Sequence, residues 1–136
     1  MKKIRIIIFL IIIFTLLGSA YAWFFIWNKP QQNIKAAKAT RVQAAILFSE
    51  YSTNENTANS KYIDKVVEVT GEVNSISKNT EGKTVVLLKT DNLMFGVNCT
   101  LEEDAPITEG ETISIKGICT GYLTDVVLIR CYKTSK

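Results

Sequence analysis

The chain opens with a long apolar stretch that is preceded by basic residues. From Ile6 to Trp27 there are 22 residues without a charged side chain, and three basic residues come before them. At about 1.5 Å per residue, a helix of this length can cross a hydrocarbon core of about 30 Å. Basic residues favour the cytoplasmic side, whereas the aromatic residues near Trp27 favour the opposite interface. Residues 1–28 are therefore predicted to be a membrane anchor that contacts the lipid bilayer through residues 6–27.

A cleaved signal peptide is the alternative interpretation of the same segment. Ala20-Tyr21-Ala22 fits the small-residue pattern of a cleavage site that follows an apolar region. Cleavage there would leave Trp23-Phe24-Phe25-Ile26-Trp27 as the new N-terminus, and such an apolar end is unfavourable in water. The length of the run favours the uncleaved anchor. Under both interpretations the rest of the chain lies outside the cytoplasm.

The apolar run is followed by a polar segment and then by helical periodicity. Residues 29–39 show neither strand alternation nor an apolar stripe until alanines begin, and we interpret them as a linker. Thr40 and Gln43 form a capping-box pattern, and Ser52 begins a second one. One or two short helices are thus expected over residues 40–62. The apolar side chains of the first helix recur at i, i+3, i+4 and i+7 as Ala44, Leu47, Phe48 and Tyr51.

Beyond the helical region the apolar positions alternate with polar ones, which is typical of half-buried β-strands. Five such runs follow, and an acidic connector over residues 101–110 separates the third from the fourth. The parity of the apolar positions changes within the first run, so a β-bulge is expected near Asn74 or Ser75. The runs are defined by Val67, Val69, Gly71 and Val73; by residues 84–90; by Leu93, Phe95, Val97 and Cys99; by Ile113, Ile115, Gly117 and Cys119; and by Val127, Ile129 and Cys131.

The number and order of the strands indicate the fold. Closure into a barrel removes most of the exposed edges that five short strands would leave in a flat sheet. Three consecutive strands, a connector and a final hairpin suit the oligonucleotide/oligosaccharide-binding (OB) barrel, whereas an immunoglobulin-like sandwich needs about seven strands. The predicted fold is mainly β: a five-stranded OB-type barrel preceded by one or two short α-helices and an N-terminal transmembrane helix. Its extracytoplasmic domain is expected over residues 40–136.

Several motifs in these strands match one known family. They are Tyr62-Ile63-Asp64-Lys65-Val66-Val67-Glu68-Val69-Thr70-Gly71, Phe95-Gly96-Val97-Asn98-Cys99, and Gly117-Ile118-Cys119-Thr120-Gly121-Tyr122 leading to Asp125-Val126-Val127-Leu128 and Cys131. Over Leu47–Tyr132 the chain resembles the tRNA_anti-like family of bacterial OB-fold proteins. The resemblance implies a barrel carried by a small membrane-anchored or exported protein. The family name reflects similarity to anticodon-binding domains and does not imply that tRNA is bound.

The position of the charges weakens the case for a nucleic-acid partner. The net charge of +3 comes from the basic residues before the apolar run, because 13 basic and 13 acidic side chains follow from Lys29 onward. From Val66 to Lys136 there are 7 basic and 10 acidic side chains. Nucleic acid therefore remains a possible partner, but one that the net acidic barrel disfavours.

The sequence contains few groups that could perform catalysis or bind a metal. It has no histidine, and its three cysteines are spaced 20 and 12 residues apart, without a C-x-x-C pair. It also lacks a phosphate-binding loop, a dinucleotide glycine motif and a nucleophile elbow. The acidic run Glu102-Glu103-Asp104 does not have calcium-binding spacing and is interpreted as a solvated loop. We therefore expect no catalytic residues, no metal site and no cofactor.

The cysteines suggest a possible disulfide. Cys119 and Cys131 flank the last turn almost symmetrically about Asp125, and each shares the parity of the inward residues of its strand. They could therefore face each other across the hairpin in a compartment where disulfides persist. The alternative is that all three cysteines, Cys99 included, are small buried apolar residues.

A possible ligand face follows from the usual behaviour of OB barrels, which bind ligands on the outer face of the second and third strands. The outward positions of the third run include Met94, Gly96 and Asn98, with Lys89 and Tyr122 expected at the rim. Outward parity on the last strand also predicts a small patch of one cation and one aromatic ring, formed by Arg130 and Tyr132.

Taken together, these features predict a non-catalytic binding or interaction module on the outer side of the cytoplasmic membrane, in the bacterial periplasm or at the cell surface. Its partner is expected to be an unknown protein or a small ligand. Two alternatives stay open. The first is a protein that binds single-stranded nucleic acid, and the second is a structural subunit of an envelope complex.

Overall fold

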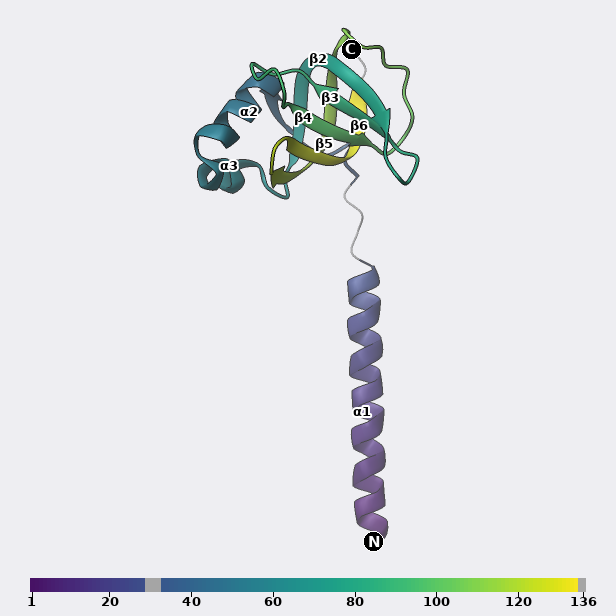
Figure 1. Cartoon of the computed structure of the whole chain (residues 1–136). Coiled ribbons are helices and arrows are strands. Elements are labelled where there is room, and N and C mark those ends of the chain that lie inside the picture. The colour runs from purple at the N-terminus through teal and green to yellow at the C-terminus, as the bar shows by residue number, and fades with distance from the viewer. Residues whose placement is uncertain (29–32, 135–136) are drawn as a thin grey trace. The chain divides into compact units, whose positions relative to one another are not determined.

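The computed structural model describes residues 1–28 and 33–134 (Figure 1). The chain divides into two compact units, Met1–Gln32 and Asn33–Lys136. The first part of the predicted linker, residues 29–32, lies outside the described residues, as do the last two residues of the predicted domain. The rest of that linker belongs to the second unit, because Ile34 is buried and the Lys35 ammonium contacts the Glu103 carboxylate at 2.8 Å.

The first unit is the helix α1 (Lys2–Trp27), as the uncharged run predicted. Within the described residues it is the one helix that is long and apolar enough to cross a membrane. Aromatic rings pair along its last turns, with the centroids of Trp23 and Trp27 6.2 Å apart. The apolar helix is therefore confirmed.

The second unit is a closed barrel, and two short helices that precede most of its strands in the chain lie beside it (Figure 1). The strands run in the order β1-β2-β3-β4-β6-β5, and an additional pairing between β2 and β5 closes the ring. All neighbouring strands of the ring are antiparallel except β4 and β6. The predicted barrel of five strands is thus confirmed. The strands are β1 (Thr40–Gln43), β2 (Val66–Lys78), β3 (Thr84–Leu88), β4 (Val97–Leu101), β5 (Thr112–Tyr122) and β6 (Val126–Thr134).

The long strand β2 closes the barrel because it pairs with two different strands. Its first half, Val66–Glu72, pairs with β5, and its second half pairs with β3. The register with β3 shifts between Val73 and Ser75, so Asn74 is the additional residue of a β-bulge. A bulge bends a strand and increases its twist, which allows one strand to serve both neighbours. The bulge was predicted at this place.

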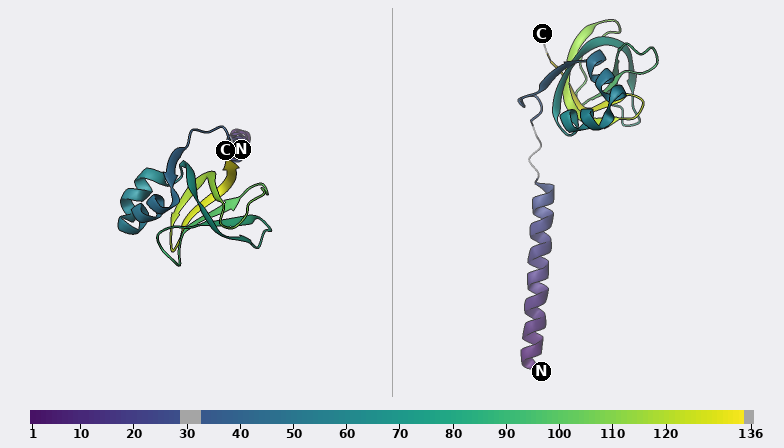
Figure 2. Two further views of the ribbon diagram at one scale, coloured as in Figure 1. Left: turned by 90° about the horizontal axis from the view of Figure 1, so that it is seen from above. Right: turned by 90° about the vertical axis from the view of Figure 1, so that its left-hand side faces the viewer.

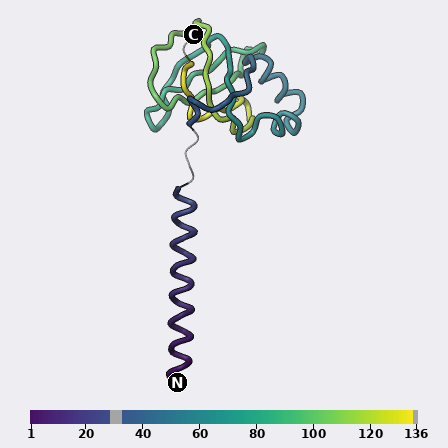
Figure 3. Tube along the Cα trace, turned by 180° about the vertical axis from the view of Figure 1, so that it is seen from behind, coloured from purple at the N-terminus to yellow at the C-terminus, as the bar shows by residue number. Residues whose placement is uncertain are grey.

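The short strand β1 corrects the predicted start of the first helix. Thr40 does not cap a helix, and Gln43 is the residue before the helix but makes no capping hydrogen bond with its side chain. Residues 40–43 instead pair in parallel with Val67–Thr70 of β2. Seen from behind, the segment 33–43 crosses the barrel wall on its way to the helices (Figure 3). The β-branched residue Val42 packs against the core, and this long-range pairing outweighs the local capping pattern.

Two short helices, α2 (Ala44–Thr53) and α3 (Glu55–Tyr62), cover one end of the barrel (Figure 2, right). All four residues of the predicted apolar stripe are buried in the barrel core. The approach is close, since a Cβ added at Gly71 of β2 would lie 2.9 Å from the Cβ of Ala44. The second helix is also confirmed, but its cap is Asn54, whose side chain accepts from the Thr57 N–H at 3.1 Å, and not Ser52.

The third predicted strand begins later than its apolar alternation indicated. Residues 93–96 form a loop because the Asn92 side-chain oxygen accepts from the N–H groups of Met94 (2.8 Å) and Phe95 (3.1 Å). Such local bonds compete with strand pairing. Leu93, which was predicted to point inward, is 98% exposed. That part of the prediction was wrong, and β4 starts at Val97.

If α2 closes the barrel end, truncating its buried face must destabilise the domain. We expect Leu47→Ala to lower the free energy of unfolding by about 2–5 kcal/mol, because Leu47 is fully buried in the core. Ile46→Ala is the matched control, since Ile46 is the adjacent residue and is 49% exposed. Urea unfolding of the full chain in detergent, followed by far-UV circular dichroism, measures both. Equal losses for the two variants would contradict this packing.

Candidate binding face of the barrel

The outer face of β3, β4 and β6 is the candidate functional site. In Figure 1 β3 and β4 face the viewer, and no described helix lies in front of them. Side chains alternate along each strand, so every second one points away from the core. The outward side chains are half-buried, and they are Val85 and Leu87 of β3, Asn98 and Thr100 of β4, and Val127 of β6.

The strand register arranges these side chains in rows across the face. Leu87 lies opposite Asn98, and Asn98 lies opposite Val127, so that an amide stands between two aliphatic side chains. In the next row Val85 lies opposite Thr100. Cross-strand neighbours of this kind are close enough to contact one ligand together. The face therefore combines apolar contact with neutral hydrogen-bonding groups.

The lysines around this face are paired with carboxylates. Lys78 contacts Asp104 at 3.2 Å, and Lys83 contacts Glu102 at 3.1 Å. A hydrogen bond from Thr84, followed by one from Lys78, lowers the pKa of Asp104, so this carboxyl group is ionised at neutral pH. The rim consequently presents balanced charge and not a basic groove.

The structure places three of the predicted ligand residues near this face. Asn98 points outward at its centre, as predicted. Lys89 follows β3 directly and lies 3.6 Å from the Glu72 carboxylate. Met94 belongs to the loop before β4 and is 78% exposed. Gly96, in contrast, is buried. It lies so close to the end of β3 that a Cβ at this position would overlap the carbonyl oxygen of Leu88.

Tyr122 does not lie free at the rim. Its ring packs edge-on against Phe48 and stacks on Tyr51, with centroid distances of 5.8 Å in both cases. Both partners belong to α2, so this tyrosine holds the helix on the barrel. Its role is packing between the helix and the hairpin of β5 and β6.

The predicted patch of Arg130 and Tyr132 is also changed by the structure. Lys116 and Ile118 of β5 are separated by one residue, but their partners in β6 are separated by two, Arg130 and Cys131. The additional residue makes a bulge, in which Arg130 has a φ of 53°. This bulge interrupts the alternation on which the shared outward parity was based. The Tyr132 ring is covered by the Lys35 ammonium, 4.7 Å from its centroid. It is therefore not a free stacking surface.

Sequence reasoning missed the aliphatic part of the face. Val85 and Leu87 were treated only as members of a strand pattern, although they have the opposite parity from the inward residue Val86. Val127 was predicted to point inward, and this was wrong, because Val126 and Leu128 are the buried residues of that part of β6. The signal was present in the run of residues 84–90, which is apolar at both parities. Such a run indicates a strand with apolar groups on both faces.

The three cysteines converge in the barrel interior as buried thiols. Cys99, Cys119 and Cys131 come from β4, β5 and β6 and are fully buried. The hairpin is centred one residue before Asp125, and Cys119 lies opposite Leu128 instead of Cys131. The register on which the Cys119–Cys131 disulfide was predicted is therefore wrong.

The environment of these thiols does not activate them. Burial raises the pKa of both Cys119 and Cys131. The Cys119 sulfur lies 3.3 Å from the Tyr51 hydroxyl. Reactive cysteines require a lowered pKa and access to solvent, so these thiols act as small core residues. Among residues 1–28 and 33–134, no group of three His, Cys, Asp or Glu side chains is arranged to hold a metal ion.

The strand order of the closed ring, in which only β4 and β6 pair in parallel, defines the protein class as an OB-fold binding module. The tRNA_anti-like family model matches residues 1–133, and the chain belongs to this family. No curated protein matches the chain.

One similar solved structure is described as a "putative nucleic acid-binding lipoprotein" from Klebsiella pneumoniae subsp. pneumoniae. The TM-score is 0.53 and the sequence identity is 16%. The match covers 79% of this chain and 100% of that chain. At this identity the similarity supports the fold.

Because the register separates the cysteines that were expected to pair, we expect three free thiols. The folded chain should resist alkylation by iodoacetamide, and the chain denatured without reductant should take up one label on each cysteine. Mass spectrometry of intact protein purified from the membrane counts the labels. A denatured chain that takes up only one label would show that two cysteines are joined.

Proposed function

We propose that the chain is a membrane-anchored binding module of the cell envelope that acts without catalysis. α1 spans the cytoplasmic membrane with its N-terminus inside, and the barrel lies on the outer side. The ligand is a protein segment that binds across the outer face of β3, β4 and β6. The observation that carries this proposal is the uncovered row of Leu87, Asn98 and Val127, with its balanced rim.

The chemistry of the face favours a polypeptide. Aliphatic side chains provide apolar contact area, and the amide of Asn98 both donates and accepts hydrogen bonds, as a peptide group requires. A nucleic-acid strand instead needs a basic groove and aromatic rings that stack on the bases. The lysines at the rim are paired with carboxylates, and the outward positions of β3 and β4 carry no aromatic ring.

A single-stranded nucleic acid is the second candidate. It is supported by the description of the Klebsiella lipoprotein, which shares the fold. Association with that ligand would release counterions from the phosphates and weaken steeply with salt. The net acidic barrel and the paired lysines at its rim make it the less favoured candidate.

The charge pattern around α1 supports an orientation with the barrel outside. We expect a cysteine introduced by Thr124→Cys, at an exposed turn position, to react with a membrane-impermeant maleimide in intact cells. The native cysteines are buried and serve as an internal background. Lys2→Cys is the control and should react only after the membrane is permeabilised. The reverse pattern would contradict the proposed topology.

Site-specific crosslinking tests the face and its ligand together. A photoreactive amino acid at Asn98 should give a discrete adduct in intact membranes, whereas the same group at Asn56, an exposed asparagine of α3, should give none. Digestion identifies the partner, because a protein adduct is degraded by protease and a nucleic-acid adduct by nuclease. A nuclease-sensitive adduct would select the second candidate, and equal adducts at both positions would contradict a ligand on this face.

A further inference from the structure

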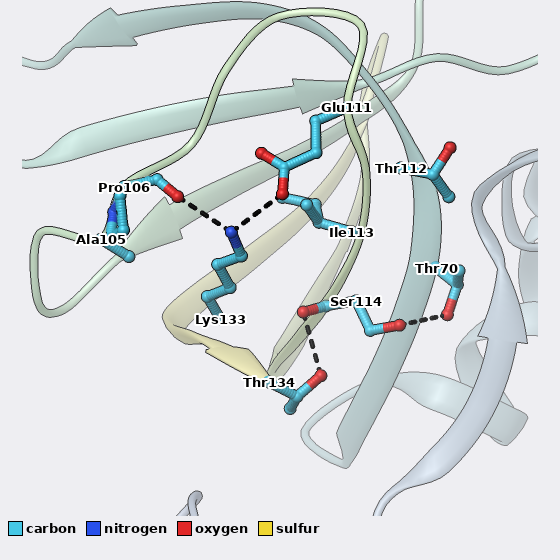
Figure 4. Close-up of a pocket in the computed structure, with 9 residues that line it drawn as sticks. All are labelled: Thr70, Ala105, Pro106, Glu111, Thr112, Ile113, Ser114, Lys133 and Thr134. Carbon is cyan, nitrogen blue, oxygen red and sulfur yellow. Dashed lines mark hydrogen bonds and ion pairs between the residues drawn. The ribbon is translucent and has the colours of Figure 1, made fainter. Parts of the chain in front are cut away.

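A second hollow opens on another part of the barrel wall, between β5, the end of β6 and the connector over residues 102–111 (Figure 4). Its volume is about 440 Å³, which lies within the usual range of small-molecule sites. Its lining comes from β2, β5, β6 and the connector, and it shares no residue with the rows of the β3, β4 and β6 face. It was not anticipated from the sequence.

One wall of the hollow is a row of hydroxyl groups. Thr70, Ser114 and Thr134 lie opposite one another across β2, β5 and β6. The Thr70 and Ser114 hydroxyl oxygens are 2.7 Å apart, and one hydrogen bond between two hydroxyls uses only one of their two hydrogens. The other hydrogen can be donated to a ligand. Thr112, at the exposed rim, adds a further hydroxyl.

The opposite wall contains one cation and one anion that neutralise each other. Lys133 donates to the carbonyl oxygen of Pro106 at 2.9 Å and to Glu111 at 3.1 Å (Figure 4). An ammonium group has three hydrogens, and within the described part of the chain the third has no acceptor and can be donated to a ligand. The hydrogen bond from Lys133 lowers the pKa of Glu111, so the carboxylate stays ionised at neutral pH. The same bonds fix the connector against β6 and hold this wall in place before a ligand binds.

The remaining surface of the hollow is apolar. Ala105 and Pro106 of the connector line it beside the polar groups, whereas the Ile113 side chain of β5 is packed into the barrel core. A matching ligand therefore carries no net charge, offers several hydroxyls that can donate to Glu111 and accept from Lys133, and has a small apolar group. A sugar with an N-acetyl substituent has all of these properties.

We infer that this hollow is a binding site for a neutral saccharide that carries an N-acetyl group. Ring hydroxyls exchange hydrogen bonds with Glu111, Lys133 and the hydroxyl row, and the acetyl methyl group contacts Ala105 and Pro106. The site is separate from the proposed protein-binding face, and its occupation does not depend on that function.

The test is a titration of the ¹⁵N-labelled full chain with N,N′-diacetylchitobiose, followed by nuclear magnetic resonance. A zwitterionic detergent is used because a sugar-based detergent would compete for the site. We expect saturable shifts at Ser114, Lys133 and their neighbours, and weaker binding of cellobiose, which has the same linkage without acetyl groups. Shifts confined to the β3 and β4 face, or no saturable shift at millimolar sugar, would overturn the inference.

Single substitutions test which residues contribute to sugar binding. Lys133→Met should weaken binding about tenfold or more, because methionine has a side chain of similar length but lacks the charged hydrogen-bond donor. Lys83→Met is the matched control: it breaks an ion pair of the same 3.1 Å length at the rim of the other face. Thr112→Val removes the hydroxyl of an exposed residue at the rim of the hollow. This variant should fold normally and weaken binding severalfold.

Two outcomes of this set would count against the saccharide. If Lys83→Met weakens binding as much as Lys133→Met, the sugar does not occupy this hollow. If inorganic phosphate shifts the same resonances and the disaccharide does not, the hollow selects an anion through Lys133. Either result overturns the inference but leaves the crosslinking test of the β3, β4 and β6 face unaffected.

Discussion

β2 is paired along its first half with β5 and along its second half with β3, and only a strand that bends can satisfy both partners. The bulge at Asn74 supplies the bend, and the ring closes as a result. Closure decides which side chains enter the core and which form the outer face. It also brings β2 beside β5, so that Thr70 meets Ser114 in the hollow that the connector completes around Lys133. Both candidate sites therefore depend on one irregular position in one strand.

Local patterns were sufficient where the structure is local or where burial is strictly alternating. The stripe of α2, the alternation of β5 and the parity change at Asn74 all led to correct elements. The patterns failed where a distant partner or a side-chain bond decides the conformation. Thr40–Gln43 forms a strand because β2 offers an edge to pair with, and Leu93 is exposed because the Asn92 side chain holds the loop before β4. The edge of β2 lies outside a short window of sequence, whereas Asn92 lies beside Leu93 but its bonds to the backbone do not change the apolar alternation from which the strand was predicted.

The candidate sites were less predictable than the fold for the same physical reason. Asn98 could be placed outward because its strand alternates regularly, but a bulge at Arg130 disrupted the equivalent argument for β6. Tyr122 was expected to meet ligand and instead contacts α2, because an aromatic ring beside a barrel end is well suited to cover it. The hydroxyl row of Thr70, Ser114 and Thr134 depends on the register of three strands, and no local feature marks these residues.

The buried thiols also determine how this domain can mature. Its core is completed by sulfur atoms that pack as apolar groups, so with the three free thiols expected above folding would require no oxidant and no disulfide isomerase. An oxidising and a reducing compartment would then give the same yield of native barrel. Strand pairing, and not a redox enzyme, would set the rate at which the domain assembles.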